Sequence, residues 1–159
     1  MTFPFPTEWP QYFTASIPNW LPLFFMIENK RIELNAFVVM DNHIHLIWQL
    51  LSGHSLSSVQ LNFMKFTAQQ IKFALAIDNP ALLEQCKVNK KDREYQIWKR
   101  KPLSVELSSE KVFQQKLEYI HCNPVKAGIC LYPEDYHFSS DLFYENGLDH
   151  FNMITHYMV

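Results

Sequence analysis

The sequence predicts an α+β domain in which a small antiparallel sheet carries helices on one face. Two runs, residues 32–40 and 43–50, are apolar at alternate positions and flank Asp41-Asn42, a pair that favours a tight β turn. Two longer stretches, residues 55–77 and 109–121, repeat apolar residues at the spacing of an amphipathic helix. Short strands joined by a tight turn and combined with such helices are typical of this class.

The first half of the chain is expected to supply the sheet. Tyr12–Ile17 alternates polar and apolar residues as a first strand would, and Pro18 ends it. Leu23–Lys30 is long enough for a helix of two turns. The next strand, Ile32–Met40, is predicted to have one apolar face, made of Ile32, Leu34, Ala36, Val38 and Met40.

The second half is expected to supply the longer helices. Ser55–Ile77 forms the first of them, and Asn79-Pro80 ends it. Tyr95–Trp98 is a short strand, and Ser109–His121 is a second helix that stops at Asn123-Pro124. The order of elements resembles a ferredoxin-like βαββαβ unit with an added helix, and the length fits one domain, 1–159.

The composition favours a folded protein of the cytoplasm. Apolar residues make up 48% of the chain, which argues against disorder. The three cysteines, Cys86, Cys122 and Cys130, are an odd set without close spacing, which argues against a disulfide framework or a thiolate zinc site. No apolar run approaches the roughly 20 residues of a membrane helix, and no secretion signal is visible.

The net charge of −2, from 14 basic and 16 acidic side chains, does not by itself indicate a polyanionic partner. Nucleic-acid binding would therefore depend on a local patch, and residues 87–101 form one. Its cationic members are Lys87, Lys90, Lys91, Arg93, Lys99, Arg100 and Lys101. A solvated connector rich in lysine explains the same segment equally well.

The return strand of the hairpin, His43–Leu50, carries the first candidate for chemistry. Alternation places Ile44 on one face of the strand and both His43 and His45 on the other. Two neutral imidazoles held side by side make half of a divalent-metal site. The alternative is a solvated strand that carries two histidines by chance, but the position directly after a tight turn favours a site.

A tyrosine and an amide share one flank of the second helix. Tyr119 lies about 120° from the centre of the apolar stripe, and Asn123 lies about 40° further round. One turn apart, the phenol and the amide could serve as nucleophile and third metal ligand. Taken alone, this segment is also explained by a half-buried tyrosine followed by an ordinary helix stop.

Four segments resemble, in order, those of one enzyme family. Met40–Ile47 is similar to the His-hydrophobic-His segment of HUH-type single-tyrosine transposases. Lys116–Gly128 is similar to the catalytic-tyrosine segment of the REP-associated tyrosine transposases within that group, and Pro133–Ser140 resembles the segment that follows it. Gln96–Trp98 fits the short strand before that helix. The resemblance runs from about Tyr12 to the C-terminus.

The resemblance implies a substrate of single-stranded DNA beside a hairpin, such as a folded repeat at the end of a mobile element. It implies that Tyr119 attacks a backbone phosphate and leaves a 5′-phosphotyrosine bond and a free 3′-hydroxyl. The metal on His43, His45 and Asn123 would be Mg²⁺ or Mn²⁺ on family grounds, although the ligands suit zinc equally. The basic patch is expected to contact DNA phosphates together with two further residues, Lys116 and Lys126.

One departure from the family concerns the helix between the first two strands, for which only Pro18–Arg31 is available. A shortened helix would leave part of the sheet exposed, and a homodimer could cover it. His121 could equally be a phosphate contact or a structural residue. Two other functions stay open: a domesticated or decaying relative that binds hairpin nucleic acid without cutting it, and an unrelated His-x-His hydrolase.

Overall fold

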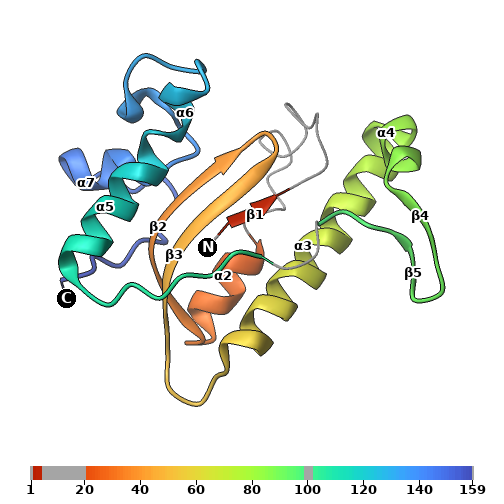
Figure 1. Cartoon of the computed structure of the whole chain (residues 1–159), viewed down its shortest axis with the longest axis horizontal. Helices are drawn as coiled ribbons and strands as arrows, with labels where there is room; N and C mark the ends of the chain where they lie inside the picture. Colours follow the sequence, from red (N-terminus) through yellow and green to blue (C-terminus); the bar gives the residue numbers. More distant parts are fainter. Residues whose placement is uncertain (1, 5–20, 99–101, 159) are drawn as a thin grey trace.

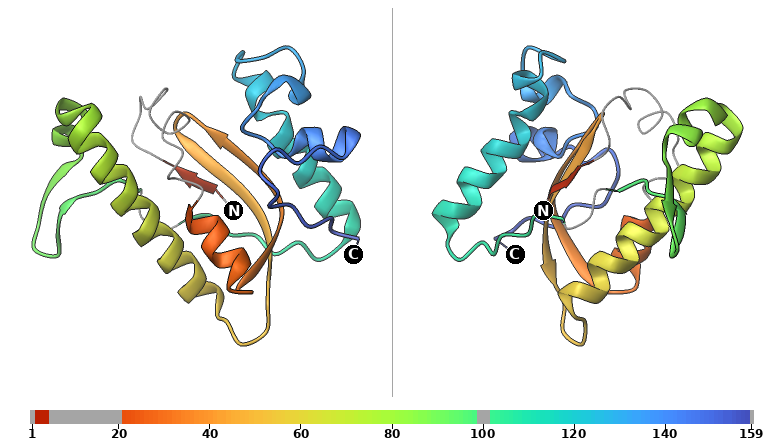
Figure 2. Two further views of the ribbon diagram at one scale, coloured as in Figure 1. Left: turned by 180° about the vertical axis from the view of Figure 1, so that it is seen from behind. Right: turned by 45° about the vertical axis from the view of Figure 1, so that its right-hand side comes forward.

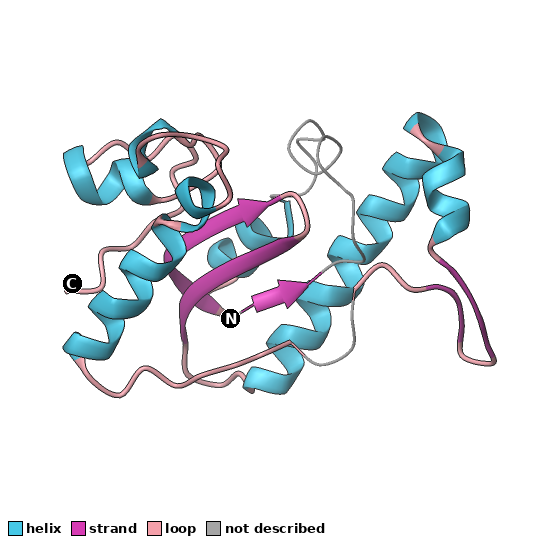
Figure 3. Ribbon diagram, turned by 45° about the horizontal axis from the view of Figure 1, so that its top comes forward, coloured by secondary structure: helices cyan, strands magenta, loops and turns pink. Residues whose placement is uncertain are grey.

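The computed structural model describes residues 2–4, 21–98 and 102–158, so the predicted strand Tyr12–Ile17 lies outside the described residues. A three-stranded antiparallel sheet of order β1-β3-β2 forms the centre, and a two-stranded ribbon stands apart from it (Figure 1, Figure 3). The strands are β1 Thr2–Pro4, β2 Ile32–Met40, β3 His43–Leu50, β4 Lys87–Lys90 and β5 Arg93–Tyr95. The helices are α2 Leu21–Glu28, α3 Leu56–Asp78, α4 Pro80–Gln85, α5 Glu110–His121, α6 Asn123–Lys126 and α7 Asp141–Asn146, with a 3-10 turn, η2, at Pro133–Asp135.

The β2–β3 hairpin forms around the Asp41-Asn42 turn as predicted, and Val38 of β2 pairs with His45 of β3. The predicted alternation of β2 fails at one point, because the register shifts between Leu34 and Ala36. A bulge adds one residue to the strand and so reverses the facing of the side chains beyond it. β2 therefore buries apolar side chains on both faces of the sheet, and the single apolar face predicted for this strand is wrong.

Helices α2 and α3 cover one face of the sheet (Figure 2). The larger core cluster lies there, where Leu23 and Met26 of α2 pack with Phe63 and Ile71 of α3. The helix between the first two strands was expected to be short, and α2 spans eight residues. It nevertheless buries Leu23 and Met26 in the core cluster on the sheet, whereas Phe25 stays exposed. Association into a homodimer stays a prediction.

Helix α5 covers the opposite face (Figure 2). The core cluster on this side is smaller, and its buried members are Ala36, Val38, Met40, Ile47, Phe113, Leu117 and Ile120. The α+β class and the antiparallel sheet are confirmed. The helices, however, lie on both faces and not on one, because β2 presents apolar side chains to both, such as Phe37 to the larger cluster and Val38 to the smaller one.

The C-terminal segment follows the outer edge of β2. The Val39 amide donates to the Phe138 carbonyl over 2.9 Å, and the Ser140 amide donates to the Phe37 carbonyl over 3.0 Å. An uncovered edge strand would expose a row of unpaired amides and carbonyls. The segment thus protects the edge of the sheet, and it brings Ser140 and the start of α7 close to α5.

The β4–β5 ribbon follows α4, which lies at the C-terminal end of α3 (Figure 1). The predicted strand Tyr95–Trp98 overlaps β5 only at Tyr95. Trp98 instead lies in the larger core, where its Nε1 donates to the Thr67 hydroxyl over 2.9 Å. No helix in the described part of the chain is long and apolar enough to cross a membrane.

Candidate active site

The start of β3 holds two imidazoles on the face that α5 covers. Their ring centroids lie 4.7 Å apart and their planes meet at 84°. His45 is only 5% exposed, whereas His43 is half-buried and its Nδ1 hydrogen-bonds with Oδ1 of Asn42 in the turn. Ile44, between them, lies in the core of the opposite face, as predicted.

Burial keeps both imidazoles neutral. It lowers the pKa of His45 from its ordinary value of 6.5 to about 3, and the neighbouring His43 lowers it further. Burial also lowers the pKa of His43, although Asn123 and Asp41 favour its protonated form. A neutral imidazole keeps a nitrogen lone pair, which is the form that binds a metal ion.

Tyr119 lies on the last turn of α5, beside His45. Its ring centroid is 5.6 Å from that of His45, with the two planes at 84°, and the side chain remains 47% exposed. Two cations lie over the phenol ring: the Nζ atoms of Lys116 and Lys126 are 5.7 Å and 5.1 Å from its centroid. A half-exposed phenol between cationic side chains is accessible to a phosphodiester.

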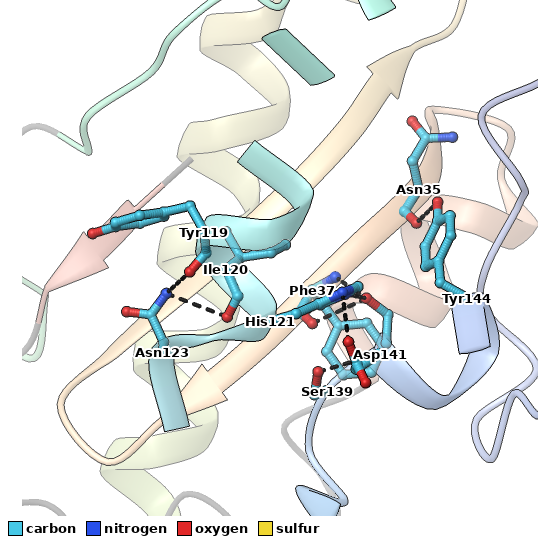
Figure 4. A network of polar contacts seen from close by, with 10 residues as sticks. Asn35, Phe37, Tyr119, Ile120, His121, Asn123, Ser139, Asp141 and Tyr144 are labelled. Atoms are coloured by element: carbon cyan, nitrogen blue, oxygen red, sulfur yellow. Dashed lines mark hydrogen bonds and ion pairs between the residues drawn. The ribbon is translucent and has the colours of Figure 1, made fainter. Parts of the chain in front are cut away.

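Asn123 connects the helix to the two imidazoles. Its Nδ2 donates to the carbonyls of Tyr119, over 2.8 Å, and Ile120, over 3.2 Å (Figure 4). Burial lowers the pKa of His43 and of His45, and the Asn123 side chain opposes this by raising both, so it lies beside the two rings.

These three groups fit a divalent metal ion by their chemistry. Two neutral imidazoles and one amide oxygen supply three donors without charge, and other coordination positions stay open for substrate oxygens. The described residues contain no group of three His, Cys, Asp or Glu that could hold a metal. A third protein ligand for His43 and His45 among these residues would therefore be a donor of another kind, and Asn123 stays the predicted one.

The structure brings together only some of the predicted DNA-binding residues. Lys116 and Lys126 lie at Tyr119. Four others lie on the β4–β5 ribbon, on the far side of α3 from α5 (Figure 1). These are Lys87, Lys90, Lys91 and Arg93. Three more lie outside the described residues: Lys99, Arg100 and Lys101. The ribbon and the tyrosine are thus separate surfaces.

Several ribbon cations have partners of their own. Lys87 pairs with Glu84 over 2.8 Å, Arg93 pairs with its neighbour Asp92, and Lys90 donates to the Gln96 side chain over 2.8 Å. Surface pairs of this kind are worth little and exchange readily for phosphate. Both predicted interpretations of this segment, phosphate contact and solvated connector, stay open.

Sequence reasoning missed the buried polar contacts of α5. His121 is 5% exposed, and its Nδ1 lies 3.0 Å from Oδ1 of Asp141 in the C-terminal segment (Figure 4). On a helical wheel His121 lies only about 40° from Leu117 of the apolar stripe, which is a signal for burial. Its partner could not be found from sequence, because the contact joins residues that only the fold brings together.

Comparisons with known proteins support the resemblance. No protein-family model matches the chain. A Haemophilus influenzae protein named among the REP-associated tyrosine transposases is 29% identical over 115 residues, 71% of this chain and 61% of the relative. The chain thus spans less than two thirds of that relative's length. A solved structure of a REP-associated tyrosine transposase bound to a REP hairpin has a TM-score of 0.67 at 22% identity, covering 93% of this chain and 79% of that chain. The predicted resemblance to this family and the fold are confirmed.

Proposed function

We propose that the chain cleaves and rejoins single-stranded DNA beside a hairpin, as in DNA transposition, with Tyr119 as nucleophile. The observation that carries the proposal is the meeting of three groups at one point: the Tyr119 ring, the His43–His45 pair and the Asn123 amide. The similarity to REP-associated tyrosine transposases supports it, and one of these is known in a complex with a REP hairpin.

A phosphodiester would bind between Tyr119 and its two lysines. Lys116 and Lys126 supply positive charge beside the phenol, where the transition state adds negative charge to the phosphate. Two lysines neutralise few phosphates, so we assign part of the affinity to a second surface. The β4–β5 ribbon, with Lys90 and Lys91 exposed, is the surface that we assign to the hairpin stem.

In the covalent step, a phosphodiester bond of the DNA is exchanged for a phosphodiester bond to Tyr119, so no external energy source is needed. The Tyr119 oxygen forms a bond to phosphorus, the bond from phosphorus to the 3′ oxygen breaks, and a 3′-hydroxyl leaves after taking up a proton. An imidazole that holds a metal has no free lone pair, so neither His43 nor His45 would take the phenol proton. The proton would pass to solvent, which reaches the half-exposed Tyr119 side chain.

A metal ion held by His43, His45 and Asn123 would act as a Lewis acid on the phosphate oxygens. Mg²⁺ or Mn²⁺ is the ion that we propose, and zinc is the alternative by ligand chemistry. Rejoining follows when the 3′-hydroxyl of another strand attacks the phosphotyrosine and releases Tyr119. No nucleotide hydrolysis is required because the phosphotyrosine bond stores the energy of the cleaved bond.

The test uses 3′-labelled oligonucleotides that contain a hairpin with randomised unpaired flanks, incubated with the full chain and Mg²⁺ or Mn²⁺. We expect a labelled fragment that migrates with the protein after denaturation and is released by protease. Hairpin binding without any product would instead support the binding-only relative. Free fragments without a covalent complex would support a hydrolase. Either of these outcomes would contradict the proposal.

A further inference from the structure

Three buried polar side chains form a continuous chain from α5 to the sheet. The imidazole of His121 lies 3.0 Å from Oδ1 of Asp141 through Nδ1, and 2.8 Å from the Ser140 hydroxyl through Nε2. All three residues are less than a tenth exposed. A carboxylate oxygen accepts and an imidazole N–H donates, so the contact has the geometry of a hydrogen bond from Nδ1 to Asp141.

The chain continues into β2. The Phe37 amide donates to the Ser140 hydroxyl over 2.9 Å, and the Ser140 hydroxyl lies 3.2 Å from the Phe37 carbonyl. Phe37 precedes Val38, and Val38 is the residue that pairs with His45 across the hairpin. A sequence of short polar contacts thus links the helix that carries Tyr119 to the strand pair that carries His45.

The arrangement of serine, histidine and aspartate is not a hydrolytic site. Ser140 is 2% exposed, and its oxygen is already bonded to the backbone of β2. A nucleophile must reach its substrate, whereas Ser140 is buried among the described residues. The three side chains therefore have a structural role and not a nucleophilic one.

Apolar packing alone leaves the rotation of α5 poorly defined. Its buried side chains, Phe113, Leu117 and Ile120, contact a small cluster on the sheet. Such contacts have no preferred direction, whereas a hydrogen bond constrains both distance and angle. His121 and Tyr119 project from the same turn toward different sides, one buried and one exposed. Fixing the imidazole therefore fixes where the phenol points.

We propose that the Asp141–His121–Ser140 chain is a positioning device, which sets the rotation of the last turn of α5 so that Tyr119 and Asn123 face His43 and His45. The catalytic consequence rests on the proposed function, whereas the geometric claim does not. A misplacement of about 1 Å at a reacting atom can reduce a rate by about 10²-fold. The three residues are thus positioning residues for Tyr119.

The experiment measures the environment of Tyr119 by ¹⁹F NMR of protein labelled with fluorotyrosine, with its signal assigned by the loss in Tyr119→Phe. In Asp141→Ala we expect this signal to shift or broaden, and the cleavage rate to fall by about 10²-fold while hairpin binding changes by less than about twofold. Asp141→Asn keeps an oxygen that accepts from Nδ1, so it should restore both. Glu145→Ala, an exposed change on the same helix α7, is the matched control.

A purely structural role would give a different result. Asp141→Ala would then lower the melting temperature while the Tyr119 signal and the cleavage rate stayed those of the wild type, and the proposal would be overturned. If Asp141→Ala does not fold, the apolar pair His121→Phe with Asp141→Leu replaces it, since such pairs often keep a fold stable. A wild-type Tyr119 signal in that variant would also overturn the proposal. If the wild-type chain cuts no DNA, the proposed function fails, but the NMR comparison still decides the positioning claim.

Discussion

The two faces of the β2–β3 hairpin are held in different ways. On the face covered by α2 and α3, a large apolar cluster surrounds Phe63, and the buried Thr67 hydroxyl donates to the Phe63 carbonyl and accepts from Trp98 Nε1. On the face covered by α5, a small apolar cluster is supplemented by His45, His121 and Asp141, all buried. One face stabilises the fold, and the other holds side chains in defined directions.

This difference has a physical reason. Burial of apolar area stabilises without directing, and it tolerates small displacements at modest cost. Reactive groups need a defined direction, which buried hydrogen bonds supply at the expense of desolvation. Substitutions on the first face should therefore change stability, and substitutions on the second should change chemistry. The following experiments test this division.

The largest effect is expected from Tyr119→Phe. The change removes the nucleophilic oxygen and keeps the ring against His45. Cleavage should fall by at least about 10⁴-fold, as when other enzymes lose their nucleophile, while hairpin binding stays within about twofold. Gel assays of covalent complex and filter binding measure the two. Tyr132→Phe, at an exposed tyrosine outside the cluster, is the control. A covalent complex in Tyr119→Phe would move the nucleophile elsewhere.

On the opposite face, Phe63→Ala should damage the fold and spare the chemistry. Phe63 is 1% exposed and packs beside Trp48 and Trp98. Truncating such a ring costs about 3–5 kcal/mol of unfolding free energy. Urea unfolding measures this loss, and cleavage below the melting temperature should stay within about threefold of the wild type. A rate loss as large as that of a site variant would contradict the division between the faces.

The pH dependence of stability should report the buried imidazoles. In the metal-free protein, the pKa of His45 lies near 3, against an ordinary value of 6.5. As the pH falls below 6.5 the unfolded chain binds a proton that the fold excludes, so stability is complete above about pH 6.5 and is lost toward pH 3. Between pH 7 and pH 5 the loss from His45 is about 2 kcal/mol. Urea unfolding of wild type and His45→Gln measures it, and equal slopes for both would contradict the burial argument.

Metal binding should depend on the histidines and not on the strand as such. His43→Ala should weaken Mn²⁺ binding by about 10²-fold, because one of three protein ligands is lost. Gln49→Ala changes an exposed residue of the same strand and should leave Mn²⁺ binding unchanged. Titration calorimetry measures both. Retention of full Mn²⁺ affinity in both His43→Ala and His45→Ala would place the metal elsewhere.

The smallest effect is expected at the β4–β5 ribbon. If Lys90 and Lys91 contact phosphates, changing both to alanine should reduce the salt dependence of hairpin binding by about two counter-ions and the affinity several-fold. Lys65→Ala, on the exposed side of α3, is the matched control. Binding isotherms at several salt concentrations measure the slope. An unchanged slope would support the solvated connector.

The sequence predicted those parts of the molecule that local patterns determine. The hairpin turn, α3, α5 and the shared facing of His43 and His45 all follow from periodicity and turn chemistry. The bulge in β2 could not be predicted, because residues 36–40 are apolar at every position and give no signal for a change of facing. The bulge divides the predicted face, so that Leu34 lies in the larger core cluster and Ala36 in the smaller one.

Long-range contacts could not be predicted either, because no local sequence pattern specifies them. Ser140 and Asp141 meet His121 only because the C-terminal segment follows the edge of β2. Nothing in the local sequence fixes that path. The predicted site residues Tyr119, His43, His45 and Asn123 do come together, whereas the basic segment on the ribbon lies apart from them.

The most direct test of the central claim is to map the covalent bond. The full chain is incubated with the hairpin oligonucleotides in Mn²⁺ or in chelator, digested with protease and nuclease, and examined by mass spectrometry. We expect a nucleotide on the peptide that contains Tyr119, formed in Mn²⁺ and absent in chelator. A nucleotide on any other residue, or an equal yield in chelator, would contradict a metal-dependent site built from Tyr119, His43, His45 and Asn123.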